Sequence, residues 1–263
     1  MIGKVFSMTK SEQQFISRLE QFIPNFTLSV NQMEQLRVFY ENLIEWNKVM
    51  NLTTIVEEED VYTKHFLDSY SILTSVPRET FAEPETNKFQ QKIIDVGTGA
   101  GFPGLPIAIA FPWIQMTLMD SLNKRIKFLE DTVSKLKLKN VTCIHGRAEE
   151  LGRDRNHREQ YDYVVSRAVA NLSTLNEYCL PFTKVGGKFI AYKGDKAAEE
   201  IPKGKAAAEI LGAKLTGEFS FFLPETDYHR TILTFTKQKT TPKKYPRKAG
   251  TPAKEPLGEA LKA

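Results

Sequence analysis

Apolar positions follow a helical period in the first 80 residues. Met33, Leu36 and Tyr40 recur at intervals of three and four residues, the spacing that places side chains on one helix face. Two Ser/Thr-x-x-Glu/Gln pairs, which begin at Thr9 and Ser29, match the capping box that marks a helix start. The pattern therefore predicts an N-terminal helical extension over residues 1–80.

A third helix is predicted over residues 57–75, and it contains the run Lys64-His65-Phe66-Leu67-Asp68-Ser69. His65 and Asp68 lie three positions apart and therefore share a helix face. We interpret them as a structural hydrogen-bonded pair, since nothing else in the sequence assigns them chemistry.

From residue 92 onward, short β-branched runs alternate with longer amphipathic ones. Strands are expected at 92–96, 115–119, 141–145, 161–166 and 187–192, and helices at 103–110, 121–138, 171–180 and 195–211. This alternation predicts a parallel sheet covered on both faces. Two last strands, at 214–223 and 229–236, are joined by so short a connection that they must be antiparallel.

The fold class that results is α/β, with a Rossmann-like seven-stranded sheet that is mostly parallel and ends in an antiparallel hairpin. We divide the chain into the helical extension (1–80), a polar, Pro-containing linker (81–91), the sheet domain (92–237) and a basic C-terminal tail (238–263).

The first strand runs into a glycine-dense turn, Gly97-x-Gly99-x-Gly101, and then into Pro103, which suits the first position of a helix. A dinucleotide fingerprint would place its third glycine at 102, where this chain has Phe102. Asp95, two residues before the loop, repels a pyrophosphate and favours an ammonium group. S-adenosylmethionine has an ammonium, a sulfonium and no phosphate, so it fits this loop better than a dinucleotide.

A second acidic residue, Asp120, ends the next strand, where a carboxylate accepts hydrogen bonds from ribose hydroxyls. The alternative is a purely structural glycine turn with Asp120 as a helix N-cap. The two carboxylates together favour the cofactor site.

Three further segments end at the same edge of the predicted sheet. Ala148 and Glu149 follow the third strand, where a backbone amide and a carboxylate reach an adenine; Glu149 as a mere helix-start acid is the alternative. Arg167 ends the fourth strand and Lys193 the fifth, and ordinary solvation of the rim is the alternative for both. An Arg directly after a buried strand is nevertheless costly to place without a partner.

The net charge of +4 is unevenly distributed. Residues 237–263 hold eight Lys or Arg and two Glu, a net charge of +6, so the remaining residues sum to −2. The Pro-rich segment 241–252 lacks any period. It is either a solvated, disordered terminus or a flexible polycation that neutralises nucleic-acid phosphates, with Tyr245 free to stack on a base. The candidate RNA contacts are Lys243, Lys244, Arg247 and Lys248 in the tail and Lys124, Arg125 and Lys193 beside the strand ends.

Several classes of protein are excluded by composition. The chain has no apolar run of about 18 residues and no apolar signal region over residues 1–10, so we expect no membrane association. Cys143 and Cys179 stand alone without metal-ligand spacing, which predicts reduced thiols and no metal. We expect a cytoplasmic protein that acts as a monomer.

Taken together, these motifs resemble the bacterial 16S rRNA methyltransferase G family, also called glucose-inhibited division protein B. The resemblance extends from about Trp46 to the C-terminus. It is carried by Asn51-Leu52-Thr53, His65-Phe66-Leu67-Asp68-Ser69, the glycine loop with Phe102-Pro103-Gly104, Asp120-Ser121-Leu122-x-Lys124-Arg125, Arg147-Ala148-Glu149, Ser166-Arg167-Ala168 and Tyr245-Pro246-Arg247-Lys248.

The resemblance implies the S-adenosylmethionine-dependent methyltransferase fold and methyl transfer to N7 of a guanine in 16S rRNA, free or in the small ribosomal subunit. It also implies cofactor contacts at Gly97, Phe102, Asp120, Ser121, Leu122, Ala148, Glu149 and Arg167, to which the loop pattern adds Asp95, Gly99 and Gly101.

The residues that are absent agree with this chemistry. Pyrimidine C5 methylation needs a Cys nucleophile, and adenine N6 methylation commonly uses an [DN]-P-P-[FYW] loop; after the fourth strand this chain has Ser166-Arg167-Ala168 instead. Guanine N7 already presents a lone pair, so positioning suffices and no general base is expected. Arg167 is then a positioning residue. We expect removal of residues 238–263 to weaken RNA binding and to leave cofactor affinity nearly untouched.

Three alternatives come from other classes. A NAD-dependent dehydrogenase is disfavoured by Phe102, by Asp95 and by the lack of a Tyr-x-x-x-Lys motif. A non-catalytic RNA-binding protein does not need the glycine loop with both carboxylates, and a small-molecule methyltransferase does not need the basic tail. Calorimetry with S-adenosylmethionine and with NAD separates the first two from the expected enzyme.

Overall fold

A seven-stranded sheet forms the centre of the molecule in the computed structural model, which describes residues 7–83 and 91–258. The strands are β1 (Lys92–Val96), β2 (Gln115–Asp120), β3 (Val141–His145), β4 (Tyr161–Arg167), β5 (Thr183–Lys193), β6 (Ala213–Phe222) and β7 (His229–Lys237). Their order is β3-β2-β1-β4-β5-β7-β6. Strands β1 to β5 are parallel, and β7 runs antiparallel to β5 and β6, so the predicted fold class is confirmed.

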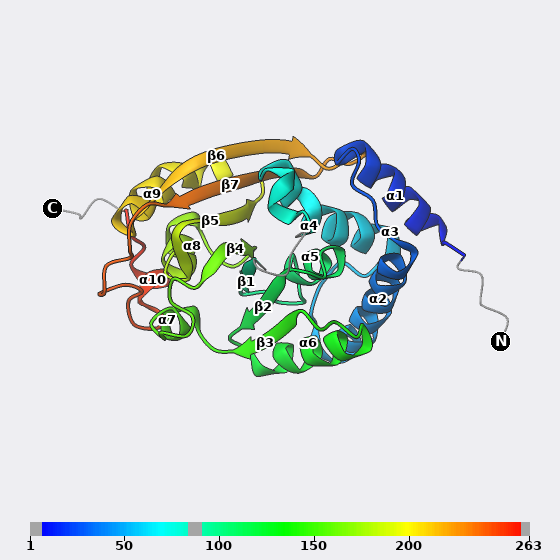
Figure 1. Ribbon diagram of the computed structural model, residues 1–263, viewed down its shortest axis with the longest axis horizontal. Coiled ribbons are helices and arrows are strands. Elements are labelled where there is room, and N and C mark those ends of the chain that lie inside the picture. The colour runs from blue at the N-terminus through cyan, green and yellow to red at the C-terminus, as the bar shows by residue number, and fades with distance from the viewer. Residues whose placement is uncertain (1–6, 84–90, 259–263) are drawn as a thin grey trace.

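Helices cover both faces of the sheet (Figure 1). They are α1 (Lys10–Phe22), α2 (Val30–Met50), α3 (Glu58–Val61), η1 (Tyr62–Leu67), α4 (Asp68–Tyr70), η2 (Ser71–Thr74), η3 (Arg78–Phe81), α5 (Gly104–Ala110), α6 (Asn123–Lys135), α7 (Ala148–Leu151), α8 (Leu172–Cys179), α9 (Ala197–Ile210) and α10 (Thr251–Lys254). The N-terminal helices lie on the side of α5, whereas α8, α9 and α10 lie on the other side.

Consecutive residues of a central strand are buried on opposite faces of the sheet, in two separate hydrophobic clusters. Ile93 belongs to a cluster that includes the N-terminal helices and α5, whereas Ile94 belongs to a second cluster formed with α8 and α9. Successive side chains of a strand point to opposite faces, so a strand that is apolar at consecutive positions must be covered on both. The buried, parallel central strands explain why the sequence shows runs of β-branched residues here.

The N-terminal helices share their core with the glycine loop. Phe39 of α2 stacks on Phe102 with ring centroids 5.1 Å apart, and Phe66 of η1 lies 5.9 Å from the same ring. The helical extension therefore supports the loop directly. Phe81, the first residue of the predicted linker, is buried and stacks on Phe111 at 5.0 Å. The remainder of the linker at 84–90 lies outside the described residues.

Several predicted boundaries are wrong by a few residues: β5 begins at Thr183 rather than 187, and α6 ends at Lys135 rather than 138. Helix α6 begins at Asn123 rather than 121, because the Leu122 N–H donates to Asp120 Oδ1 (2.9 Å) and keeps Ser121 and Leu122 in a loop. Pro103 is the residue before helix α5, not its first residue. Both capping boxes and the helical course of 58–74 are confirmed, although the last includes a π-helical stretch.

The order in which the chain adds strands to the sheet reverses between β1 and β4. It moves outward from β1 to β2 and β3, and then returns to place β4 on the other side of β1. In open α/β sheets, ligands bind at the carboxyl ends of the strands beside such a reversal. This edge, which carries the ends of β1 to β5, is therefore the place to examine for a site.

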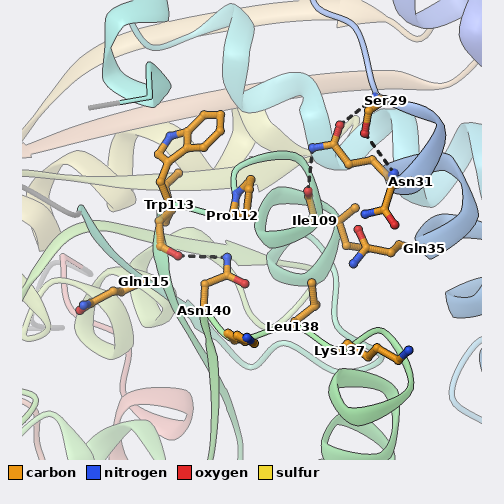
Figure 2. A pocket seen from close by; sticks show the side chains of 13 residues that line it. Ser29, Asn31, Gln35, Ile109, Pro112, Trp113, Gln115, Lys137, Leu138 and Asn140 are labelled. Carbon is orange, nitrogen blue, oxygen red and sulfur yellow. Dashed lines mark hydrogen bonds between the residues drawn. The ribbon is translucent and has the colours of Figure 1, made fainter. Parts of the chain in front are cut away.

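The opposite edge holds a cavity of about 570 Å³ between the start of α2, the end of α5 and the turn before β3 (Figure 2). Its amides serve the backbone: Gln32 Nε2 donates to the carbonyls of Ile109 and Ala110, and Asn140 Nδ2 donates to the carbonyls of residues 108, 111 and 114. These bonds satisfy carbonyls at the end of α5 and in the turn that follows it, so we assign the cavity a structural role.

Glu12 of α1 connects this helix to α2 and η1. Its fully buried carboxylate accepts hydrogen bonds from the Thr9 N–H (2.8 Å), the Tyr62 hydroxyl (3.0 Å) and the guanidinium of Arg37. Burial opposes ionisation, but these donors outweigh it and hold the pKa of Glu12 below its usual value.

We expect Glu12→Ala to lower the free energy of unfolding by roughly 2–4 kcal/mol, because it leaves several donors without their acceptor. Urea denaturation measures this change. Glu45→Ala is the matched control: Glu45 forms an exposed ion pair with Lys48, so its removal should leave the free energy of unfolding unchanged. Equal stability of the two variants would contradict the role given to Glu12.

Candidate active site

Asp95 holds the glycine loop after β1 through hydrogen bonds from two of its residues. Its Oδ2 accepts hydrogen bonds from the Thr98 hydroxyl (2.7 Å) and from the Gly104 N–H (2.9 Å), so one carboxylate ties both ends of the loop. Gly97, with φ of 72°, adopts the left-handed conformation that favours glycine. The loop is therefore a rigid turn whose shape depends on a buried charge.

Asp95 is fully buried, and burial raises its pKa to about 6, although the bonds from Thr98 and Gly104 act in the opposite direction. Its Oδ1 is buried without a hydrogen-bond partner among the described residues. Asp95 lies beneath the loop and lines none of the cavities described below. Gly101 likewise packs against Leu105, since an added Cβ would come within 2.5 Å of that side chain.

Asp120, at the end of β2, fixes the other side of the loop. Its Oδ2 accepts from the Gly99 N–H (3.0 Å) and pairs with Arg125 (3.2 Å), while Oδ1 accepts from the Leu122 N–H. The carboxylate is nearly buried but borders a cavity. Arg125, a predicted RNA contact, is thus an ion-pair partner inside the site.

Two cavities flank the loop and share Gly97, Ser121 and Val169. The larger, of about 480 Å³, is lined by Leu52, Thr53, His65, Gly97–Ala100, Phe102, Asp120, Ser121, Arg125 and Arg167–Val169. The smaller, of about 190 Å³, is lined by Val96, Gly97, Met119, Ser121, Gly146–Glu149, Val169, Tyr178 and Gly250. The structure thus brings most of the predicted cofactor residues together around one loop, from four strand ends. Asp95, Gly101 and Leu122 line neither cavity.

A third cavity, of about 310 Å³, adjoins the larger one, with which it shares His65, Arg167 and Ala168. Its other lining residues include Lys64, Tyr192, Lys193 and Arg230. It is therefore a cationic cavity, and Arg167 is the guanidinium that borders both it and the larger cavity beside the glycine loop.

Arg167 is held in place by the helix that carries the His65-Phe66-Leu67-Asp68-Ser69 motif. It donates to Asp68 Oδ2 (2.7 Å), to the Lys64 carbonyl (3.3 Å) and to His65 Nδ1 (3.0 Å). Its guanidinium also lies 5.2 Å from the centre of the Phe102 ring. The interpretation of His65 and Asp68 as a mutual pair is wrong: both bind Arg167, and no hydrogen bond joins them in the described part of the chain.

His65 is neutral in this arrangement. Burial, and then the charge of Arg167, lower its pKa to about 3. Because Arg167 donates to Nδ1, the ring proton must be on Nε2, which lies 3.0 Å from Thr53 Oγ1. The ring stacks on Phe102 at 4.4 Å. Thr53 and His65 are site residues that the sequence interpretation did not assign. The π-helix η1 carries His65, and such insertions are frequent at functional sites, whereas Thr53 lies in the loop between α2 and α3.

The predicted RNA-contacting cations differ in availability. Lys124, Lys243, Lys244 and Lys248 are exposed. Lys193 pairs with Glu200 (2.7 Å), and its Nζ donates to the Ala170 carbonyl (3.0 Å).

The expectation of a flexible tail is wrong for the part of it that the structure describes, which ends at residue 258. Arg247 binds the buried carboxylate of Glu177 with two donor groups, and Tyr245 is only 7% exposed, so Tyr245 is not free to stack on a base. Backbone carbonyls of the segment, which a disordered chain would expose to water, are bonded by Arg153 and Arg158 instead.

Neither Cys143 nor Cys179 lines any of the three cavities. Burial raises the pKa of the Cys143 thiol to about 12. Within residues 7–83 and 91–258, no group of three His, Cys, Asp or Glu side chains comes together as a metal site would require. No helix in these ranges is long and apolar enough to cross a membrane.

Comparison with known proteins agrees with this geometry. The family model described as rRNA small subunit methyltransferase G matches residues 32–222. A ribosomal RNA small subunit methyltransferase G of Alkaliphilus metalliredigens is 49% identical over 232 residues, which cover 88% of this chain and 93% of the relative. Its counterpart in Exiguobacterium sibiricum is 48% identical over 94% of this chain and 100% of the relative.

Among solved structures, a fibrillarin pre-rRNA processing protein of Methanococcus jannaschii aligns with 60% of this chain and 71% of its own, with 18% identity and a TM-score of 0.47. We draw no conclusion from that structural likeness. The family match and the curated relatives extend over most of the chain. The chain therefore belongs to the rRNA small subunit methyltransferase G family.

Proposed function

We propose that this enzyme transfers a methyl group from S-adenosylmethionine to N7 of a guanine in 16S rRNA. The observation that supports this most is the row of three adjoining cavities at the carboxyl edge of the sheet, two around the glycine loop and one lined by cations. A cofactor site and a nucleotide site then meet at Arg167, which borders both.

The residues around the loop fit S-adenosylmethionine. A Cβ added to Gly99 would meet nothing within 4 Å, so the loop leaves open space for a ligand, and two carboxylates lie beside it. Gly97, Gly99, Phe102, Asp120, Ser121, Leu122, Ala148, Glu149 and Arg167 would hold the cofactor, with Asp120 on the ribose. When bound, the cofactor supplies a methyl group on a sulfonium. Asp95 would act through the loop, as a buried charge of the sign that favours a cation.

The cationic cavity suits the target nucleotide. Arg167 and Arg230 share the single carboxylate of Asp68, so the cavity has an excess of guanidinium groups over their nearest acid. Guanidinium groups donate to phosphate oxygens and to guanine O6. We propose that Arg167, Arg230 and Lys193 orient the guanine and its phosphate toward the loop.

The chemistry demands positioning rather than proton transfer. Guanine N7 carries an in-plane lone pair and needs no deprotonation before attack. The neutral His65 fixes Arg167 through Nδ1 and adds no positive charge beside a sulfonium. Arg167 is always protonated and cannot serve as a base. The residues therefore align the lone pair and the methyl group.

RNA capture beyond the site is assigned to the exposed cations of the rim and the C-terminal segment, which are Lys124, Lys243, Lys244 and Lys248. Arg247 is removed from this set because Glu177 neutralises it. One chain carries all three cavities, which supports action as a monomer, and a ribosomal substrate implies action in the cytoplasm.

The proposal is tested by incubating the protein with S-adenosylmethionine and either free 16S rRNA or small ribosomal subunits. Chain cleavage by aniline after borohydride reduction reports N7-methylguanine. We expect cleavage at one guanine. A methyl group found on another base atom, or on a small molecule only, would overturn it.

Asp120→Ala should weaken S-adenosylmethionine binding by roughly 1–3 kcal/mol, as for a lost hydrogen bond to a charged group. Calorimetry measures the affinity, with NAD as the negative ligand. Asp162→Ala is the control, since Asp162 pairs with Lys184 at the amino end of the sheet. Unchanged affinity in the Asp120 variant would exclude it from the site.

Asp95→Asn should change how stability depends on pH. The folded-state pKa of about 6 lies above the usual 3.8, so the contribution of Asp95 to the free energy of unfolding falls as pH rises from about 4 through 6. Asparagine does not titrate, and the stability difference should therefore shift in its favour by up to roughly 3 kcal/mol between pH 4 and 7.5. Urea denaturation at the two pH values tests this, and parallel pH curves would disprove it.

Replacement of Lys243, Lys244 and Lys248 by Gln should weaken RNA binding at every sequence and reduce the slope of log K against log[salt] by roughly 2–3 in magnitude, at 0.7–0.9 per phosphate contact. A salt titration measures the slope. Replacement of Lys10, Lys205 and Lys214, which are also exposed, is the charge-matched control. Equal slopes for the two triple variants would remove the segment from the RNA interface.

A further inference from the structure

The C-terminal segment forms a fixed strap across the domain, here defined as residues 241–258. Arg158 donates to the carbonyls of Thr241 and Tyr245, and Arg153 donates to that of Pro246. Farther along, Thr174 of α8 donates to the Pro252 carbonyl (3.0 Å). The strap is thus bonded along its length to the α7–β4 connection and to α8.

The strongest anchor of the strap is the ion pair between Arg247 and Glu177, three residues before Gly250, which lines the smaller cavity. Glu177 has a fully buried side chain and accepts from the Arg247 backbone N–H (2.7 Å) as well as from its guanidinium. A buried bidentate pair of this kind fixes both position and orientation. The strap therefore continues from Arg247 toward residue 250 along a defined path.

Gly250 reaches the smaller cavity beside the glycine loop. Its N–H donates to Glu149 Oε1 at 2.8 Å, and both residues line that cavity. Gly250 has φ of 82°, a conformation that other residues rarely adopt. The second carboxylate oxygen of Glu149 has no hydrogen-bond partner in the described part of the chain, and so remains available to a ligand.

We propose that Gly250 is a positioning residue for adenine recognition: its N–H holds one oxygen of Glu149 so that the other accepts the exocyclic amine of the cofactor's adenine. This inference rests on the proposed function. Asp120, the carboxylate proposed to bind the ribose, borders the larger cavity, and the next residue, Ser121, borders both cavities. The ribose therefore lies in the larger cavity and the adenine in the smaller one. A carboxylate accepts from a 6-amino group and repels a 6-oxo group, so the strap gives the site its preference for adenine.

If Gly250 holds Glu149 as proposed, removal of the tail would also weaken cofactor binding, which differs from the expectation drawn from the sequence. The segment that carries Lys243, Lys244 and Lys248 also lines the smaller cavity, at Gly250. Deletion of the whole tail would change RNA binding and cofactor binding together, so a finer experiment is needed.

Gly250→Ala is that experiment, with Gly186→Ala as its matched control. Both glycines have positive φ and open space where a Cβ would be, but Gly186 lies in β5 at the amino edge of the sheet. Calorimetry measures the affinities for S-adenosylhomocysteine and S-inosylhomocysteine, which differ at the 6-position of the purine. We expect the wild-type protein and Gly186→Ala to prefer the adenine ligand about 100-fold. Alanine keeps the backbone N–H but strains the positive φ that directs it at Glu149, so Gly250→Ala should lose about tenfold of that preference.

A chain that ends at Lys248 provides the second test. It lacks Gly250 but keeps Arg247 and the exposed lysines, and the deleted residues 249–263 contain two Lys and two Glu, so the net charge is unchanged. Its RNA affinity should stay within twofold of wild type while its preference for adenine falls. Wild-type preference in both variants would overturn the proposal. Failure of the wild-type protein to bind S-adenosylhomocysteine at all would instead overturn the proposed function.

Discussion

A single buried carboxylate, Asp68, organises the active edge of this protein. It lies in the helical extension, yet it binds Arg167 at the end of β4 and Arg230 at the start of β7. Removal of one partner from a buried ion pair leaves an uncompensated charge, so each of these three residues depends on the others. The extension is therefore part of the site. It positions the guanidinium that borders both the cationic cavity and the larger cavity beside the glycine loop, and the π-helix beside Asp68 brings His65 onto the same guanidinium.

The features that could be predicted from the sequence are local ones. Strand periodicity, capping boxes and the glycine loop depend on residues within a few positions of one another, and all of these are found where the pattern indicates. Asp95 and Asp120 are predicted beside the loop because Asp95 lies two residues before its first glycine and Asp120 directly follows the next recognisable strand. What could not be predicted are contacts across long separations. His65 and Asp68 share a helix face, which suggested a mutual bond, but Arg167, about 100 residues later, takes both.

The C-terminal strap shows that amino-acid composition alone does not predict whether a segment is ordered. Proline-rich, basic segments usually remain disordered because they bury too little apolar surface. Here the backbone supplies the missing interactions, since Arg153 and Arg158 bond its carbonyls and Glu177 neutralises Arg247. A count of charges assigns Arg247 to RNA, whereas the structure assigns it to a buried acid. The formal charge of a segment therefore overstates what it offers to a polyanion.

The same reasoning explains why acidic groups are buried at a site for a nucleic acid. A carboxylate on the surface would repel the RNA backbone, whereas Asp95, Asp68 and Glu177 are all fully buried, and Asp68 and Glu177 are paired with arginines. Asp95 favours the proton in the folded state, so its ionised form opposes folding at neutral pH. That cost accompanies the hydrogen bonds that Asp95 accepts from the Thr98 hydroxyl and the Gly104 N–H, which hold the two ends of the glycine loop together.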